Sequence, residues 1–294
     1  MTALLNFANA QFEMPRYLDV ADIKNRQPIV VVNLPNSAIV NHFSHKKNAD
    51  VLQQYNELVD DYNSDMKTLV KKFWTFNTQE ILVKTRAEIN DMMKDKTERA
   101  KYFLIYCYSI DTHPNHDFDW QIDNGGKRLV GGLSHFAIGF PGVAPFYDYD
   151  FTEVLPTSTK LAYFISTANY KFNYVFNHKE RSDKKAMMDD NMHLLGNKTL
   201  LLLKEDVNPK AAEDIGSWYP CKYKVVDEDE MENKVMAGDT NYAYTLHAGY
   251  FWIVNCADGA FLGYSLKGMD EKTGGMKKEF FLDIAEYCNA AMKK

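Results

Sequence analysis

The sequence lacks the short motifs that identify many enzymes. Its 294 residues contain no H-E-x-x-H, no G-x-G-x-x-G, no G-x-x-x-x-G-K-[ST] and no G-x-S-x-G. These patterns mark zinc hydrolases, dinucleotide-binding folds, P-loops and serine nucleophiles. No reaction and no cofactor can therefore be assigned from a motif.

An excess of positive charge is also missing. The chain has 34 basic and 40 acidic residues, a formal net charge of −6, and no stripe rich in Lys and Arg. A protein that binds nucleic acid usually presents a cationic face that displaces counterions from phosphates. Nucleic acid is therefore not expected as a partner.

Long hydrophobic runs are absent as well. The longest unbroken apolar run is Tyr102 to Tyr108, whereas a membrane-spanning helix needs about 20 residues. No transmembrane segment is expected. Hydrophobic residues make up 46% of the chain and charged residues 25%, which is typical of a protein with a full hydrophobic core.

Cysteine is scarce, and its spacing fits no C-x-x-C or zinc pattern. The four cysteines are Cys107, Cys221, Cys256 and Cys288. Cys107 lies in an apolar run, where a cysteine is usually a small buried hydrophobe. We expect free thiols, and the even number leaves disulfides open as the alternative.

The N-terminus resembles the end of a signal peptide. Ala8 and Ala10 occupy the −3 and −1 positions of an A-x-A cleavage site, followed by Gln11. The basic region and most of the apolar region of a full signal are missing. We interpret residues 1–10 as a remnant and expect a mature chain beginning at Gln11 in the periplasm or outside the cell. An ordinary N-terminus is the alternative.

The second half of the chain alternates apolar runs with helical segments, the pattern of an α/β fold. Asn208-Pro209 and Asp227 are helix-start signals, and Asp258-Gly259 is typical of a hairpin turn. The expected elements are a strand at 199–204, a helix at 208–218, a strand at 222–226, a helix at 228–237, a strand at 241–247, a hairpin at 250–266 and a helix at 277–292.

The first half repeats this order. Thr85 with Glu88 and Asp227 with Glu230 both predict a capping box at the second helix. The expected elements are a strand at 29–34, a helix at 50–74, a strand at 80–83, a helix after Thr85, a strand at 102–110, a hairpin at 161–176 and a helix at 181–195. Any α/β chain aligns loosely with itself, but in both halves the first helix also ends at an aromatic pair.

We therefore predict an α/β fold of two tandem related lobes, residues 28–196 and 198–294. Each lobe is expected to have a mixed, mainly parallel sheet, flanking helices and a C-terminal hairpin plus helix. The range 111–160 has no counterpart in the second half and is interpreted as an insertion in the first lobe, of the kind that often carries function.

The insertion supplies the candidate binding residues. It has a net charge of −4 and contains the stretch DTHPNHDFDW at 111–120. The proposed ligand-binding residues are His113, His116, Asp117, Asp119 and Trp120. Histidine with carboxylate can bind a metal or act as acid and base, but these residue types are also ordinary turn formers.

Three other features of the sequence are notable. His42 and His45 follow the first strand, near the edge where α/β folds place ligands. The run FYDYDF at 146–151 alternates aromatic and acidic residues, which favours an edge strand with one face buried over an exposed contact strip. Ser134 and His135 are neighbours in a strand, so their side chains should point to opposite faces and form no catalytic dyad.

The A-x-A-Gln end, the capped helix before NYAYTLHAG and the hairpin around Ala257-Asp258-Gly259 resemble uncharacterised exported α/β proteins of Gram-negative anaerobic bacteria. The resemblance implies a periplasmic or surface location and assigns no functional residue. We expect a non-enzymatic binding or accessory protein of the cell envelope, whose partner is an envelope protein or a small ligand. The alternative is a metal-dependent or acid–base enzyme that uses the His/Asp-rich insertion.

Overall fold

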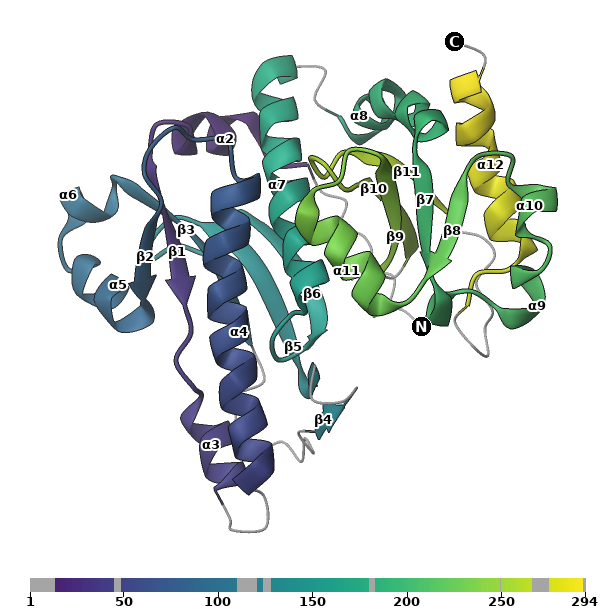
Figure 1. Cartoon of the computed structure of the whole chain (residues 1–294). Helices are drawn as coiled ribbons and strands as arrows, with labels where there is room; N and C mark the ends of the chain where they lie inside the picture. The colour runs from purple at the N-terminus through teal and green to yellow at the C-terminus, as the bar shows by residue number, and fades with distance from the viewer. Residues whose placement is uncertain are drawn as a thin grey trace. The chain divides into compact units, whose positions relative to one another are not determined.

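The computed structural model describes residues 14–44, 49–109, 121–123, 128–179, 183–248, 250–265 and 275–292. The chain divides between Ile165 and Ser166 into two compact units. We call them the N-terminal unit, residues 15–165, and the C-terminal unit, from residue 166 onward. Each is described by itself, and their elements are labelled in Figure 1.

A six-stranded mixed sheet forms the core of the N-terminal unit. Five of its strands follow the order β2-β1-β3-β5-β4, and the sixth strand, β6, also pairs with β5. β1 is parallel to β2 and β3, and β5 is antiparallel to β3, β4 and β6. The strands are β1 (Gln27–Val32), β2 (Leu82–Thr85), β3 (Tyr102–Ser109), β4 (Gln121–Asp123), β5 (Arg128–Gly139) and β6 (Tyr147–Glu153).

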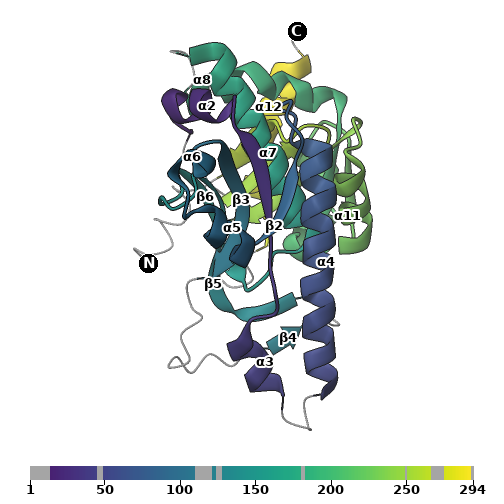
Figure 2. The same cartoon turned by 90° about the vertical axis from the view of Figure 1, so that its left-hand side faces the viewer.

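Helices cover both faces of this sheet (Figure 2). On one face, Phe136 of β5 stacks on Phe164 of α7, and Trp74 at the end of α4 contacts Phe103 of β3. On the other face, Ile89 of α5 packs against apolar residues of β1, β3 and β5. The helices are α2 (Tyr17–Ile23), α3 (Ser37–Phe43), α4 (Ala49–Phe73), α5 (Arg86–Met92), α6 (Lys96–Arg99) and α7 (Ser158–His178).

The C-terminal unit has a five-stranded sheet in the order β8-β7-β9-β10-β11. β7 is parallel to β8 and β9, and β10 is antiparallel to β9 and β11. The strands are β7 (Thr199–Leu203), β8 (Tyr223–Val226), β9 (Tyr242–Ala248), β10 (Tyr250–Asn255) and β11 (Phe261–Ser265).

One face of this second sheet packs on α9, α10 and α12 through a large apolar cluster that includes Leu200, Ile253 and Phe280. The other face packs on α11, whose Lys234 lies 4.6 Å above the ring of Tyr242. The remaining elements are α8 (Lys184–Asn191), η4 (Met192–Asn197), η5 (Lys204–Asp206), α9 (Pro209–Ala212), α10 (Ile215–Trp218), α11 (Glu228–Ala237) and α12 (Lys278–Met292).

The two units share one strand order. In each unit the first strand lies between two parallel strands, and the chain then forms an antiparallel hairpin and a helix. The corresponding elements are β1 and β7, β2 and β8, β3 and β9, β5 and β10, β6 and β11, and α7 and α12. The α/β fold of two related lobes with mixed sheets is therefore confirmed. The sheets are not mainly parallel as expected, because antiparallel pairings are at least as many as parallel ones among the described strands. The chain is divided between the two units within the residues of α7, whereas the sequence suggested ranges of 28–196 and 198–294.

The hairpin expected at 161–176 was wrong, because these residues lie in helix α7. Every residue from Leu161 to Asn169 is buried, so the helix shows no polar face and its aromatic content resembles that of a strand. The hairpin of this unit is β5–β6, inside the range 111–160 that we interpreted as an insertion. Most of that range is therefore part of the shared fold, with residues 110–127 lying before the hairpin.

Several local predictions are confirmed and others are corrected. Thr85 and Glu88 form a full capping box, whereas at α11 Asp227 caps the backbone and Glu230 pairs with Lys224 instead. The helix expected at 208–218 is split into α9 and α10, and that expected at 181–195 ends in the 3₁₀ segment η4.

The expectation of free thiols was wrong for one pair of cysteines. Cys221 and Cys288 form a disulfide with a Cα–Cα distance of 6.1 Å, which is within the usual range. Cys107 and Cys256 are buried free thiols, as expected.

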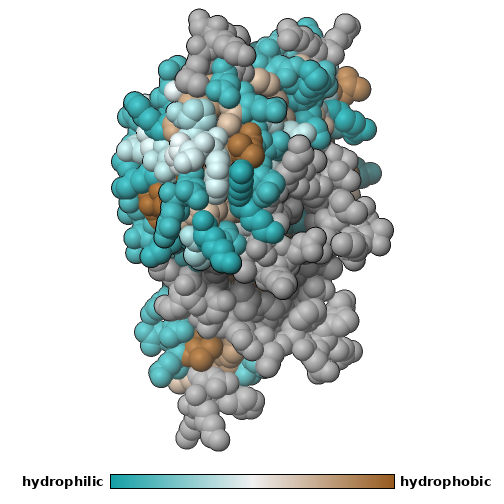
Figure 3. All heavy atoms as spheres, turned by 90° about the vertical axis from the view of Figure 1, so that its right-hand side faces the viewer, coloured by the Kyte–Doolittle hydropathy of each residue, from teal (hydrophilic) through white to brown (hydrophobic). Residues whose placement is uncertain are grey.

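Among the described residues, no helix combines the length and the apolar character needed to cross a membrane. On the face drawn in Figure 3, the coloured residues are mostly hydrophilic, and the hydrophobic ones are scattered rather than gathered into one patch. Scattered apolar side chains are ordinary on a protein surface, so this face gives no argument for a docking partner.

Candidate functional site

The candidate residues of the sequence analysis lie outside the described part of the structure. They are His113, His116, Asp117, Asp119 and Trp120, together with His45 and the segment 1–11. His42 is described and lies near the end of α3 with an exposed side chain. The structure instead brings together other residues of the N-terminal unit.

A pocket of about 350 Å³ lies at the carboxyl ends of the parallel strands in this unit. Asn33 and Leu34 follow β1, Arg86 follows β2, and Tyr108 lies near the end of β3. The other lining residues are Asn36, Tyr55, Val59, Cys107, Val154 and Leu155. From β1 the chain crosses over to β2, on one side of β1 in the sheet. From β3, on the other side of β1, the chain continues away from β1 to β5. Open α/β sheets bind ligands where the chain direction diverges in this way.

The loop after β1 is tied firmly to α4. Asn33 and Asn63 exchange two hydrogen bonds of 2.8 Å, from backbone to side chain and from side chain to backbone. The backbone N–H of Asn36 donates to the hydroxyl of Tyr55, and the Asn36 side chain accepts from Ala38 to cap α3. This wall of the pocket is therefore preformed.

Arg86 supplies the positive charge of the pocket. It is the first residue of α5, directly after the capping residue Thr85. Its guanidinium lies 5.2 Å from the ring centre of Tyr106, and it forms no ion pair with a carboxylate of the described residues. A guanidinium that is positioned by an aromatic ring keeps its N–H donors available for an anion.

Cys107 lines the pocket and is a buried free thiol. Burial raises the pKa of Cys107 to about 12, and burial also raises the pKa of the neighbouring Tyr62. The thiolate is the nucleophilic form of cysteine, and it is scarce near neutral pH when the pKa is this high. Cys107 therefore contributes packing.

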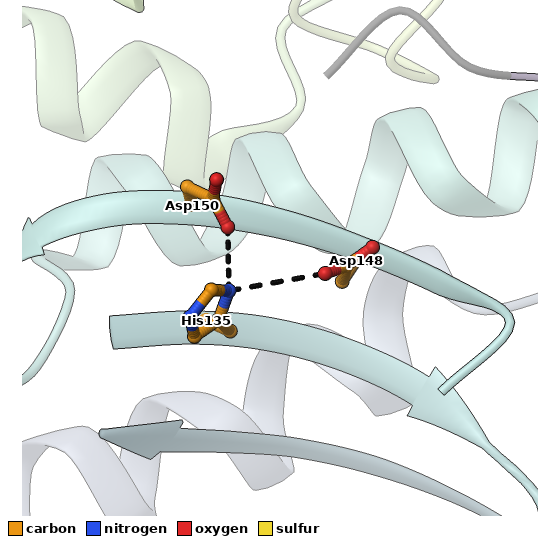
Figure 4. A group of neighbouring side chains, drawn as sticks. All are labelled: His135, Asp148 and Asp150. Atoms are coloured by element: carbon orange, nitrogen blue, oxygen red, sulfur yellow. Dashed lines mark ion pairs between the residues drawn. The ribbon is translucent and has the colours of Figure 1, made fainter. Parts of the chain in front are cut away.

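Next to the pocket, His135, Asp148 and Asp150 form a group that we call the His135 cluster. Figure 4 shows the imidazole on β5 facing the two carboxylates on the adjacent strand β6. The His135 Nδ1 atom lies 2.5 Å from Asp150 Oδ1 and 3.8 Å from Asp148 Oδ2. One suitable ligand atom from each residue lies within 4.8 Å of the others, so the group can hold a metal ion.

Tyr108 connects the cluster with the pocket. Its ring stacks on the imidazole of His135, with the ring centres 4.8 Å apart and an interplanar angle of 18°. Burial raises the pKa of Tyr108, and the charges of Asp148 and Asp150 raise it further. At neutral pH, Tyr108 is therefore a neutral phenol that can donate a hydrogen bond.

The alternation of β6 places the two aspartates on the face of β5 that carries His135. The aromatic residues of β6 are buried on the opposite face, namely Tyr147, Tyr149 and Phe151. This confirms the edge strand with one buried face that FYDYDF predicted. Ser134 also points away from His135, and its hydroxyl donates to the backbone oxygen of Val154. The sequence could have indicated this cluster if the strand-like runs at 128–140 and 146–151 had been predicted to pair as a hairpin.

Comparisons of the chain with protein-family models, with curated proteins and with solved structures find no match. The geometry of the N-terminal unit therefore carries the functional inference.

Proposed function

We propose that the protein binds a small anionic ligand, a carboxylate or a phosphate, in the pocket of the N-terminal unit. The observation that carries the proposal is the position of Arg86 in a pocket at the carboxyl ends of β1 and β3. A pocket of about 350 Å³ falls in the common range of about 300–1,000 Å³ for small-molecule sites.

The lining of the pocket is more polar than apolar. Asn33 and Asn36 lie at the end of β1, and Arg86 lies at the end of the neighbouring strand β2. Val59, Val154 and Leu155 supply the apolar remainder. Polar groups that are held in fixed positions favour a specific polar ligand.

We also propose that the protein works in the cell envelope or outside the cell. The Cys221–Cys288 disulfide supports this location, because disulfides persist mainly in oxidising compartments. The A-x-A sequence before Gln11 agrees with export. Mass spectrometry of the protein from its native cell should find Gln11 as the first residue, and intact Met1 on cytoplasmic protein would contradict the proposal.

Calorimetric titration tests the ligand class. Inorganic phosphate, citrate and small phosphate monoesters are titrated into the wild type and into an Arg86→Ala variant. We expect saturable binding by the wild type and at least tenfold weaker binding by the variant, because a charge-assisted hydrogen bond of about 1.5–3 kcal/mol is lost. An Arg99→Ala variant, which changes an arginine outside the pocket, should bind like the wild type.

A second variant tests the location of the site. Leu34 lines the pocket and is 69% exposed, so Leu34→Trp should fold normally while it occupies pocket volume. Weaker binding is expected. Equal binding by wild type, Arg86→Ala and Leu34→Trp would contradict the proposed pocket.

An enzyme that uses the region 111–160 remains the alternative function. The contact of His135 with Asp150 supports it, since a histidine oriented by a carboxylate can act as a general base. Turnover of a bound phosphate monoester that is abolished by His135→Gln would favour this alternative.

A further inference from the structure

The imidazole of His135 is in an unusual environment. The residue is 7% exposed, and its ring lies flat against Tyr108. Neither ring nitrogen makes an aligned hydrogen bond within the described structure, although Nδ1 lies close to Asp150. A buried polar atom without a partner normally costs about 1–3 kcal/mol. The contact with Asp150 offsets this cost at Nδ1 but not at Nε2, and two carboxylates facing one buried imidazole point to a ligand.

The distances are close to the separation of ligands around one metal ion. Ligand atoms at about 2.0–2.1 Å from a tetrahedral zinc ion are about 3.3 Å from one another. The His135 Nδ1 atom lies 2.5 Å from Asp150 and 3.8 Å from Asp148, values on either side of this separation. All three ligand atoms lie within 4.8 Å of one another, so the side chains must shift by about 1 Å or more to surround the ion.

We propose that His135, Asp148 and Asp150 bind one divalent transition-metal ion, with zinc as the reference ion. One imidazole with two carboxylates is a donor set that suits zinc and its first-row neighbours. The two carboxylates also compensate the charge of a divalent ion. The strand pairing of β5 and β6 holds all three residues on one sheet face.

The geometry also leaves room for a fourth ligand. The Asp148 side chain is 41% exposed and the Asp150 side chain is 15% exposed, so the carboxylate side of the cluster opens to solvent. Three protein ligands with an open position distinguish a catalytic or ligand-binding zinc from a closed structural one. The ion would therefore be accessible to water or to a further ligand.

Metal binding is independent of the anion pocket and is tested separately. The full-length chain is freed of metal with a chelator, and zinc is then titrated by calorimetry. Cobalt is titrated in parallel, because its visible absorption reports tetrahedral coordination. We expect one equivalent of each ion to bind, and zinc to raise the thermal midpoint of the wild type.

Asp148→Asn and His135→Gln are the test variants, and each should weaken zinc binding at least tenfold. Asp148→Asn keeps the shape of an exposed side chain, so it should fold even if His135→Gln does not. His113→Ala/His116→Ala removes the two histidines of the acidic stretch and should bind zinc like the wild type. Arg86→Ala should also leave zinc binding unchanged, which separates this site from the anion pocket.

Two results would overturn the metal site. The first is the absence of saturable zinc or cobalt binding by the wild type. The second is zinc binding that survives in Asp148→Asn but is lost in His113→Ala/His116→Ala, which would move the site to residues 111–120.

Discussion

In the N-terminal unit, the sheet face that packs on α5 carries the His135 cluster on its last two strands. In the C-terminal unit, the face that packs on α11 carries Trp252, Phe261 and Tyr264 on its last two strands. Trp252 stacks on Tyr264 and meets Phe261 edge to face, with ring centres 5.6 Å apart in both pairs. Trp252 is 0% exposed and Phe261 is 2% exposed.

Two units with the same strand order thus use corresponding faces differently. Buried aromatic rings stabilise a fold through the area that they remove from water and through their ring contacts. A histidine beside two carboxylates offers little hydrophobic stabilisation and much chemistry. The comparison indicates that this face stabilises the C-terminal unit and carries the candidate site in the N-terminal unit.

The largest difference is expected from truncating the central side chain of each face. Trp252→Ala should lower the free energy of unfolding by about 3–5 kcal/mol, because it leaves a large cavity in a buried cluster. His135→Ala should cost about 1 kcal/mol, within the range of ordinary substitutions. Urea denaturation followed by circular dichroism measures both. Similar losses would show that the two faces have the same role.

The disulfide distinguishes the two units in a second way. Cys221 and Cys288 are 67 residues apart, and crosslinks that close loops of this size typically contribute about 2–4 kcal/mol. Reduction, or the Cys221→Ser/Cys288→Ser variant, should therefore destabilise the C-terminal unit. Amide hydrogen exchange should accelerate in β9 and β10 and stay unchanged in β1 and β3. Equal acceleration in both sheets would contradict a disulfide effect confined to the C-terminal unit.

The glycines of the two hairpin turns provide a third comparison. Gly259 has φ +76°, and a Cβ atom there would lie 2.3 Å from the backbone carbon of Ser166. Gly142 has φ +73°, but its nearest neighbour would be the Arg99 guanidinium at 3.7 Å. Gly142→Ala should cost about 1 kcal/mol from backbone strain alone.

Gly259→Ala should cost at least about 2 kcal/mol, since the close backbone contact adds to the strain. Thermal and urea unfolding of the two variants measure the difference. A smaller loss for Gly259→Ala than for Gly142→Ala would show that the close approach to α7 is not maintained in solution.

The smallest effects are expected at the helix caps. Thr85→Ala and Asp227→Ala should each cost about 1 kcal/mol, because each removes a side-chain acceptor from the first helical turn. Only the Thr85 cap includes a reciprocal bond, from its backbone N–H to Glu88. Unfolding measurements on both variants should therefore show a slightly larger loss for Thr85→Ala.

This reciprocal bond also predicts a dependence on pH. Hydrogen bonds from the Thr85 backbone and hydroxyl, and from Lys84, lower the pKa of Glu88. A carboxyl group whose pKa falls on folding stabilises the fold above its unfolded pKa of about 4.3, and this contribution disappears as the pH falls through the lower folded value. An NMR titration of the Glu88 carboxyl checks this. An ordinary pKa would mean that the capping box does not persist.

Local signals in the sequence predicted the order of most elements. The capping residues Thr85, Asn208 and Asp227 begin helices where expected, and the Asp258-Gly259 turn joins β10 and β11. These features depend on neighbours a few residues away, and their physics is local. Helix α7 was missed because it is buried on all sides over much of its length and has no polar stripe.

The sequence by itself determined the α/β class, the tandem repeat and the one-sided pattern of β6, because strand and helix periods and caps are local properties. Only the tertiary structure decided that β5 and β6 are neighbours in the register that places His135 opposite Asp150. It also decided that Asn33 and Arg86, separated by the whole of α4, share one pocket. Both sites depend on contacts between distant segments, and these are set by sheet pairing and helix packing rather than by any local pattern.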